Sequence, residues 1–134
     1  TVWKIANGLK ISFTELMNRP EAEVEIIAAS EVEQFVEDNG RFRNFPLFPF
    51  DAERRFEVYY IEIDPQGRLE AEPHPENTQE FVTVFSGSLE IELGAEVYQV
   101  PNGSAIHFRA DSPHVYRNIS KDVCTISMVI YYPG

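Results

Sequence analysis

Two histidines and a glutamate, His74, Glu80 and His114, are the side chains of this sequence best suited to binding chemistry. Imidazole nitrogens and a carboxylate form a donor set that holds Zn, Fe, Mn or Ni and leaves coordination positions open. Glu76 lies two residues after His74 and is a candidate fourth ligand. The same groups could instead hold a small acid. The sequence therefore points to a site for an ion or a small molecule, provided that these residues meet in space.

The strand pattern around Glu80 places its carboxylate at the rim of an apolar core. Residues 80–85 are Glu-Phe-Val-Thr-Val-Phe, and a period of two puts Glu80 on one face with Val82 and Val84. His74 comes just before this strand, across a bend of proline, asparagine and threonine. We therefore expect His74 to lie near Glu80.

His114 begins another predicted strand, and the pattern of that strand indicates an inward histidine. Tyr116 and Asn118 share the face of His114, whereas Arg117 lies on the opposite face. Because a guanidinium belongs in water, the face of His114 is expected to point into the core. Tyr116 and Asn118 are therefore further candidate contacts for a ligand.

A structural interpretation of the same residues stays open. His74 and Glu76 could be solvated loop residues, and His114 could be a core histidine that bonds to a neighbour. The residue types alone do not decide between this interpretation and a metal site.

Short strands separated by turns dominate the sequence after residue 24. Residues 89–93, Leu-Glu-Ile-Glu-Leu, alternate as a strand with one wet face should. Residues 41–50 are rich in phenylalanine and proline and are expected at a sheet edge or as an extended cover. Many strands without intervening helices indicate an all-β sandwich or barrel. The predicted strands are residues 55–63, 81–85, 89–93, 97–100, 105–108, 115–118 and 125–131.

Residues 1–17 differ, because their apolar side chains recur at near-helical spacing. Asn7 and Gly8 break the run, and Ser12 with Glu15 forms a capping box for a second short helix, so the expected helices are residues 2–7 and 13–18. We expect this segment to be the tail of a separate helical domain. The predicted divisions are residues 1–19, the helical remnant, residues 20–23, a linker, and residues 24–134, the β domain.

Length and charge limit what the chain does. Its 134 residues allow one domain with a sizeable core. With 11 basic and 22 acidic residues the formal net charge is −11, and so acidic a surface is repelled by nucleic-acid phosphate. No apolar run is long enough to span a membrane. Cys124, the single cysteine, is expected to be a buried thiol, which fits a cytoplasmic protein.

Residues 67–118 resemble the two sequence motifs of the cupin superfamily. The first motif is a glycine, two histidines that flank one residue, a glutamate and a later glycine. The matching positions are Gly67, His74, Glu80 and Gly87, and Glu76 replaces the second histidine.

The second cupin motif is a glycine, a proline, another glycine, a histidine and an asparagine. Gly103, His114 and Asn118 match it, while Arg109 and Asp111 stand in place of the proline and the second glycine. The resemblance implies a double-stranded β-helix, also called a jelly-roll barrel, preceded here by a short helical segment.

The opening residues resemble the last helices of a helix-turn-helix domain of the Xre/Cro type. Residues 1–9, Thr-Val-Trp-Lys-Ile-Ala-Asn-Gly-Leu, and residues 11–16, Ile-Ser-Phe-Thr-Glu-Leu, are similar to its T-L-x-K-I-A-x-x-L and S-x-x-x-L helices. Helix-turn-helix followed by cupin is the layout of a class of bacterial transcriptional regulators. The resemblance implies the C-terminal sensor domain of an Xre-family regulator. The alternative is that residues 1–17 are an ordinary helical cover of the barrel.

Three functions are compatible with these features. The one we expect is a non-enzymatic, cytoplasmic sensor that forms a homodimer, binds a small-molecule effector and contacts DNA only through the missing N-terminal domain. The second is a small metal-dependent enzyme, a dioxygenase or isomerase, in which Glu76 ligates the metal or acts as a base. The third is a barrel that only dimerises. The candidate ligand contacts are His74, Glu80, His114, Tyr116 and Asn118, and the candidate metal ligands are His74, Glu76, Glu80 and His114.

Overall fold

Ten strands make up nearly all of the regular structure between residues 23 and 133. The structure is a computed structural model, and it describes residues 23–133. Within that range the chain has two 3-10 turns, Ala29–Glu31 and Asp38–Gly40, and no α-helix, so no helix there could cross a membrane. The strands are β1 (Phe35–Glu37), β2 (Phe42–Phe48), β3 (Phe56–Ile63), β4 (Arg68–Ala71), β5 (Gln79–Ser86), β6 (Ser88–Leu93), β7 (Glu96–Pro101), β8 (Ala105–Arg109), β9 (His114–Asn118) and β10 (Cys124–Tyr131).

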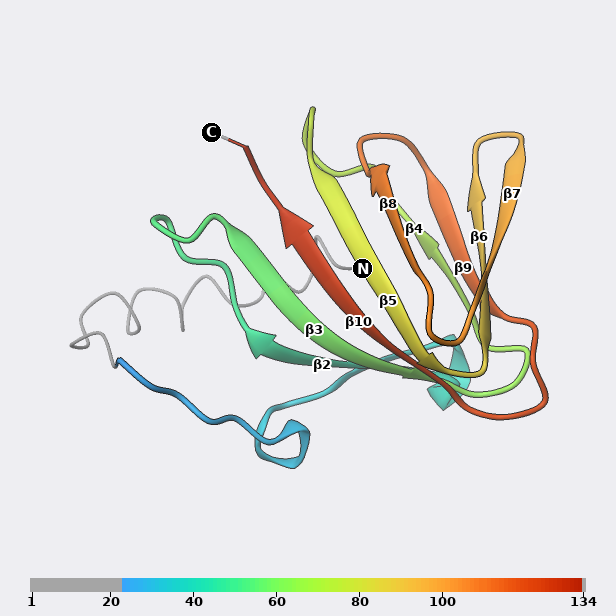
Figure 1. The fold of residues 1–134 in the computed structure, drawn as a ribbon, viewed down its shortest axis with the longest axis horizontal. Helices are drawn as coiled ribbons and strands as arrows, with labels where there is room; N and C mark the ends of the chain where they lie inside the picture. The colour runs from blue at the N-terminus through green and yellow to red at the C-terminus, as the bar shows by residue number, and fades with distance from the viewer. Residues whose placement is uncertain (1–22, 134) are drawn as a thin grey trace.

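The strands form two antiparallel sheets, which are the two walls of the fold (Figure 1). The six-stranded sheet has the order β1-β2-β3-β10-β5-β8, and the four-stranded sheet has the order β4-β9-β6-β7. The last strand, β10, therefore lies in the middle of the larger sheet between β3 and β5. This arrangement confirms the predicted all-β class. The predicted helices at residues 2–7 and 13–18 lie outside the described residues, and the division into residues 1–19, 20–23 and 24–134 stays a prediction.

Alternate residues of the strands fill the space between the sheets. In β3 and β10 every second side chain is buried, as the period of two predicts for residues 55–63 and 125–131. The buried aliphatic and aromatic side chains of both sheets form one core. Cys124 belongs to this core, and burial raises the pKa of its thiol to about 11. The predicted buried thiol is therefore confirmed, and at neutral pH it is not a nucleophile.

The phenylalanine- and proline-rich segment, residues 41–50, was predicted at a sheet edge or as an extended cover, but it lies one strand in from the edge. It forms β2, which is not the edge of the sheet but its second strand, between β1 and β3. The proline is tolerated because β1 pairs only with residues 42–44, so Pro46 has a strand neighbour on the β3 side alone. On that side the register shifts between Pro46 and Phe48. The short edge strand β1 thus explains a proline at this position.

Gly87 joins β5 to β6 where two chain segments come very close. Its φ is +75°, and an added Cβ would lie 2.9 Å from both the Cα of Cys124 and the Oγ of Ser120. We expect Gly87→Ala to lower the free energy of unfolding by about 2–4 kcal/mol, because backbone strain adds to a steric clash.

Gly103→Ala is the matched control for this variant. Gly103 has a similar φ, +78°, but an added Cβ there meets no described atom within 4 Å. Gly103→Ala should therefore lower the free energy of unfolding by the backbone strain alone, about 1 kcal/mol. Urea unfolding of the two variants measures the difference, and equal losses would rule out the close approach at Gly87 as the cause.

Candidate metal and ligand site

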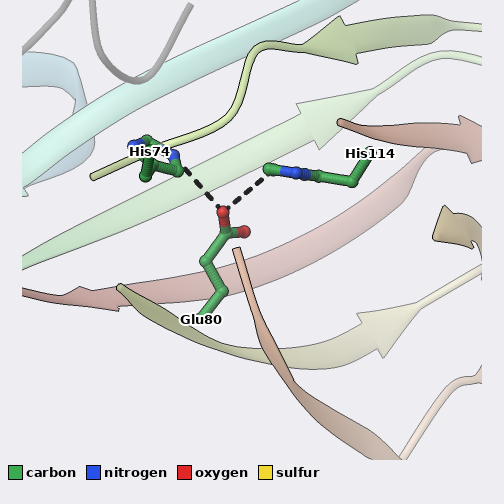
Figure 2. Close-up of side chains that lie close together, drawn as sticks. All are labelled: His74, Glu80 and His114. Atoms are coloured by element: carbon green, nitrogen blue, oxygen red, sulfur yellow. Dashed lines mark ion pairs between the residues drawn. The ribbon is translucent and has the colours of Figure 1, made fainter. Parts of the chain in front are cut away.

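His74, Glu80 and His114 meet between the sheets, although they lie far apart along the chain. The Oε2 atom of Glu80 is 3.5 Å from Nε2 of His74 and 3.1 Å from Nε2 of His114. Figure 2 shows both imidazoles directed at this one carboxylate oxygen. No more than 1% of any of the three side chains is exposed. Three potential ligand atoms therefore converge at a point shielded from solvent.

Both sheets and one loop position these side chains. Glu80 is the second residue of β5, and it faces inward beside Ile130 of β10. His114 is the first residue of β9 in the opposite sheet. His74 lies in the loop between β4 and β5, where its backbone N–H donates to the carbonyl of Ala110 at 2.9 Å. The site forms only when the two sheets close on each other.

Two hydrogen bonds orient the groups of the site. The hydroxyl of Tyr116 donates to Oε1 of Glu80, which leaves Oε2 to face the imidazoles. Nδ1 of His114 lies 2.8 Å from the carbonyl oxygen of Ser112, to which its N–H donates. The neutral ring of His114 then presents the lone pair of Nε2 to the site. A backbone carbonyl that fixes the tautomer in this way is a common support for metal-binding histidines.

Attraction between Glu80 and the imidazoles sets their ionisation. Burial alone raises the pKa of Glu80, but its contacts with His114 and His74 outweigh burial and lower the pKa from 4.5 to about 2. Burial alone lowers the pKa of His114, but the carboxylate of Glu80 outweighs burial and raises the pKa above 6.5. An ionised Glu80 therefore faces an imidazole that holds its proton more tightly than usual. Any other cation at the site must compete with that proton.

A second buried acid, Glu57, lies beside the three residues, and our sequence analysis missed it. Glu57 lies in β3 on the same inward row as Glu80, with Ile130 of β10 between them. Its exposed fraction is 0%. The signal was present in the sequence, because alternation along β3 puts Glu57 on the inward face with Tyr59 and the isoleucines that follow.

Two tyrosine hydroxyls satisfy the carboxyl group of Glu57. Tyr59 donates to Oε2 and Tyr132 donates to Oε1. Burial raises the pKa of Glu57, although both tyrosine bonds act against it. The ring of Tyr132 also lies edge-on to the ring of His74, with 6.0 Å between centroids. Glu57 therefore belongs to the polar network around the site without contacting the point where Glu80 and the histidines converge.

Comparison with known families agrees with this geometry. The Cupin domain family (Cupin_2) matches residues 59–131, which is more than half of the 134-residue chain. The chain belongs to the cupin family. The predicted jelly-roll barrel is thereby confirmed for the part that the structure describes, and the three converging residues of this cupin are the motif positions His74, Glu80 and His114.

The relatives of this cupin include transcriptional regulators. The HTH-type transcriptional regulator SutR of Escherichia coli (strain K12) is 28% identical over 133 residues, which cover 99% of this chain and 71% of that regulator. The Cupin_2 domain of an XRE family transcriptional regulator from Enterobacter cloacae is 32% identical, with a TM-score of 0.67, over 70% of this chain and 99% of that domain. The relationship to regulators of the XRE type, inferred above from the cupin motifs and the opening residues, is confirmed.

Enzymes share the fold of this cupin as well. The structure of FeII HppE has a TM-score of 0.69 over 85% of this chain and 63% of the HppE chain, but the two sequences are only 12% identical. The likeness to HppE therefore concerns the fold alone.

Two predicted site residues of this cupin do not join the others. Glu76 is exposed in the loop before β5 and lies outside the group formed by His74, Glu80 and His114. Asn118 is buried, but its amide donates to the carbonyls of Ile63 and Asp122 at 2.8 Å each. Asn118 does face inward, as the alternation along β9 predicts. It lies two positions beyond Tyr116, however, and there its amide holds a loop in place.

The donor atoms of this cupin fit a divalent metal. Within residues 23–133, both ring nitrogens of His74, Oε2 of Glu80 and Nε2 of His114 are buried without a hydrogen-bond partner. The 3.1 Å contact between Nε2 of His114 and Oε2 of Glu80 lacks hydrogen-bond geometry, so neither atom satisfies the other. One ligand atom from each residue lies within 4.8 Å of the other two. Two nitrogens and one oxygen suit Zn, Fe, Mn or Ni and leave positions open for a ligand.

The Glu80–His114 contact predicts how the stability of the metal-free cupin depends on pH. The pKa of Glu80 falls from 4.5 to about 2 on folding, so its contribution is present above pH 4.5 and is lost as the pH falls toward 2. The pKa of His114 rises above 6.5, so its contribution is present below pH 6.5 and is lost as the pH rises through the folded value. The two contributions describe one interaction, which should therefore be strongest between pH 4.5 and pH 6.5.

Glu80→Gln tests this expectation, since it removes the charge and keeps the shape. The loss in free energy of unfolding relative to the wild type should reach about 2–3 kcal/mol in that window and shrink on both sides. Urea unfolding in the presence of a chelator, at a series of pH values, measures it. A loss that does not vary with pH would show that the charge of Glu80 is not paired with His114.

Proposed function

We propose that this cupin is the ligand-sensing and dimerising domain of a bacterial transcriptional regulator whose DNA contacts lie in an N-terminal helix-turn-helix domain. The observation that supports this most is a shielded His-Glu-His group inside a barrel related to the cupin domain of an XRE family regulator. The formal net charge of −11 keeps the barrel itself away from DNA. DNA recognition therefore belongs to the other domain, and the protein acts in the cytoplasm.

The effector is a small molecule that binds where His74, Glu80 and His114 converge. Zn, Fe, Mn or Ni held by these residues would supply a positive charge to which a polar or anionic group of the effector binds. Tyr116 holds one oxygen of Glu80 and so keeps the other oxygen directed at the imidazoles. The surrounding core excludes water, which strengthens each polar contact.

A path of contacts leads from the site to the end of the last strand. The ring of His74 lies 6.0 Å from the ring of Tyr132, measured between centroids. The backbone N–H of Tyr132 donates to the carbonyl of Arg55, the residue just before β3, at 2.9 Å. A ligand that moves His74 therefore also acts on these strands. In a dimer, such a ligand favours one placement of the two recognition helices over another. The shift is only as large as the difference between the ligand's affinities for the two placements.

Thermal denaturation of the purified chain with metal ions and a library of small molecules tests the sensing function. A ligand at 100 times its dissociation constant adds about 2.7 kcal/mol to the free energy of unfolding, so a true effector raises the melting temperature clearly. The same ligand should stabilise His114→Ala far less. The proposal fails if no compound or metal stabilises the wild type, or if the hits stabilise His114→Ala equally.

A metal-dependent enzyme, a dioxygenase or an isomerase, is the second candidate. It is favoured by the open positions that two histidines and one glutamate leave on a metal and by the shared fold of HppE. It is disfavoured by Glu76, which is exposed and so is not placed to act as a ligand or base. Stoichiometric metal together with turnover of a candidate substrate, lost in His114→Ala, would favour the enzyme. Stabilisation by a compound that emerges unchanged favours the sensor.

A further inference from the structure

Two consecutive arginines, Arg54 and Arg55, have no acidic partner in a chain that is rich in acid. The formal net charge is −11, and within residues 23–133 every other arginine forms an ion pair with an aspartate or a glutamate. These paired residues are Arg41, Arg43, Arg68, Arg109 and Arg117. In the same range no carboxylate lies within 4.0 Å of the guanidinium of Arg54 or Arg55, although both residues are half-buried. A half-buried guanidinium without a counterion is well suited to bind an anion.

Neutral groups hold these two side chains in place. The guanidinium of Arg54 lies 5.8 Å from the ring centroids of both Phe48 and Phe56. Nε of Arg55 donates to the carbonyl oxygen of Tyr132 at 3.0 Å. This bond uses one N–H of the guanidinium and leaves the terminal nitrogens to bind an oxyanion in the fork geometry that arginine favours. The two charges are therefore fixed in position without being neutralised.

The backbone of Arg55 adopts a conformation that glycine would fit better. Its φ is +61°, in the left-handed region, which residues with a Cβ disfavour. The carbonyl of Asp51 closes this turn by accepting from the N–H of Arg55 at 2.6 Å. The carboxylate of Asp51 accepts from the backbone N–H groups of Glu53 at 2.8 Å and Arg54 at 3.3 Å, so it serves the loop and not the guanidiniums. A strained residue held this firmly indicates a function for its side chain.

Arg55 lies at the end of the barrel that carries the His-Glu-His site. Strands β4, β8 and β10 end there, and strands β3, β5 and β9 begin there. Figure 1 shows the loop between β2 and β3 beside the tail that follows β10, and the 2.9 Å bond from Tyr132 N–H to the carbonyl of Arg55 joins the two. The ring of Tyr132 in turn lies 6.0 Å from the ring of His74, measured between centroids. Tyr132 is therefore the one residue that connects Arg55 to the site.

We infer that Arg54 and Arg55 bind an acid group of the effector, while a second polar group of the same molecule reaches the His-Glu-His site. The inference rests on the sensing function proposed above and names the class of its ligand, a small organic acid with a carboxylate, phosphate or sulfate group. The second polar group meets the ring nitrogens of His74, which are buried without a hydrogen-bond partner, or a metal that His74 helps to hold. Because so acidic a chain repels anions elsewhere, the unpaired arginines mark the end of the barrel at which the acid approaches.

Nitrogen-15 NMR of the arginine side chains tests this anion site, with the whole chain titrated separately with inorganic phosphate, sulfate and acetate. The Nε–H signal of Arg55 should shift and saturate with at least one of these ions, and the ion that binds most tightly identifies the preferred acid group. The signal of Arg117, which is paired with Glu90, should not move. The inference is wrong if Arg55 does not respond, or if Arg117 shifts as far as Arg55, because general screening by salt moves both.

Arg55→Gln should weaken the binding of the preferred ion at least about 10-fold, because a charge-assisted hydrogen bond is lost. Arg55→Gly should lose binding to the same extent and still fold, since glycine suits the φ of +61°. Arg117→Gln is the matched control, because it removes an arginine from the other sheet, and it should leave binding unchanged. Equal losses in Arg117→Gln and Arg55→Gln would overturn the inference. Arg54→Gln, which should also weaken binding, decides the matter if neither variant of Arg55 folds.

Two further measurements separate this inference from the sensing function. His114→Ala should still bind the preferred ion at Arg55, because the two sites use different side chains. Compounds that stabilise the wild type in the thermal screen should be acids, and Arg55→Gln should reduce their effect. A stabilising compound that is neutral or cationic, or that acts equally on Arg55→Gln, refutes the arginine site and leaves the sensor standing. Saturable ion binding at Arg55 without any stabilising compound or metal supports the arginine site and refutes the sensor.

Discussion

His114→Ala is expected to weaken the binding of a divalent metal by at least about 100-fold, because it removes one of three protein ligands of the site. The two remaining donors, His74 and Glu80, hold a metal only weakly, since water must replace the lost nitrogen. Competition between the protein and a metal-binding dye measures the affinity of wild type and variant. The variant removes a ring that is 0% exposed, so its folding should be verified by circular dichroism before metal is added.

His107 provides the control for this loss. His107 is exposed on β8, where its ring stacks on Phe81 at 4.6 Å and bonds to Gln79 at 2.6 Å. His107→Ala should leave metal affinity unchanged, and so should Glu76→Ala, because Glu76 lies outside the site. Equal loss in His107→Ala and His114→Ala would mean that the metal binds somewhere else on the protein.

Glu57→Ala is expected to lower the free energy of unfolding by about 2–4 kcal/mol without removing a metal ligand. The substitution leaves the buried hydroxyl of Tyr59 and the partly buried hydroxyl of Tyr132 without their acceptor. Each buried hydroxyl that loses its partner costs about 1–3 kcal/mol, and the cavity adds to this loss. Release of the burial cost of the carboxyl group offsets part of it. Urea unfolding in the presence of a chelator measures the change.

Two variants on the same strand isolate the cause. Glu57→Gln keeps an acceptor oxygen and the shape of the side chain, so it should lose far less stability than Glu57→Ala. Glu62→Ala should lose at most about 1 kcal/mol, because Glu62 faces outward and its 3.5 Å contact with Arg43 is partly exposed. If Glu57→Gln were as damaging as Glu57→Ala, the two tyrosine bonds would not be what makes Glu57 important.

The alternation of apolar and polar residues along the sequence predicted most of the fold. Strand β10 shows this, because every second residue from Cys124 is buried, as a period of two predicts. The same pattern gave the inward direction of His114 and the outward direction of Arg117, and both are confirmed. Strand periodicity works here because each strand has one face on the core and one face away from it.

What the sequence did not reveal depends on contacts between distant segments. Glu57 and Glu80 share one inward row only because β10 pairs with both β3 and β5 and places Ile130 between them. Asn118 has the expected face, but loop carbonyls take its amide, and alternation carries no information about loops. The place of Pro46 depends on how short β1 is, which no local pattern shows.

The central claim is that two imidazoles and a carboxylate inside the barrel bind one ligand together. Nitrogen-15 NMR of the histidine side chains during a titration with Zn²⁺ tests it most directly, because the sequence has only three histidines. Signals of His74 and of Nε2 of His114 should shift together and saturate at one equivalent of metal, while His107 stays unchanged. A titration that leaves His74 and His114 unperturbed, or that shifts His107 alone, would contradict the claim.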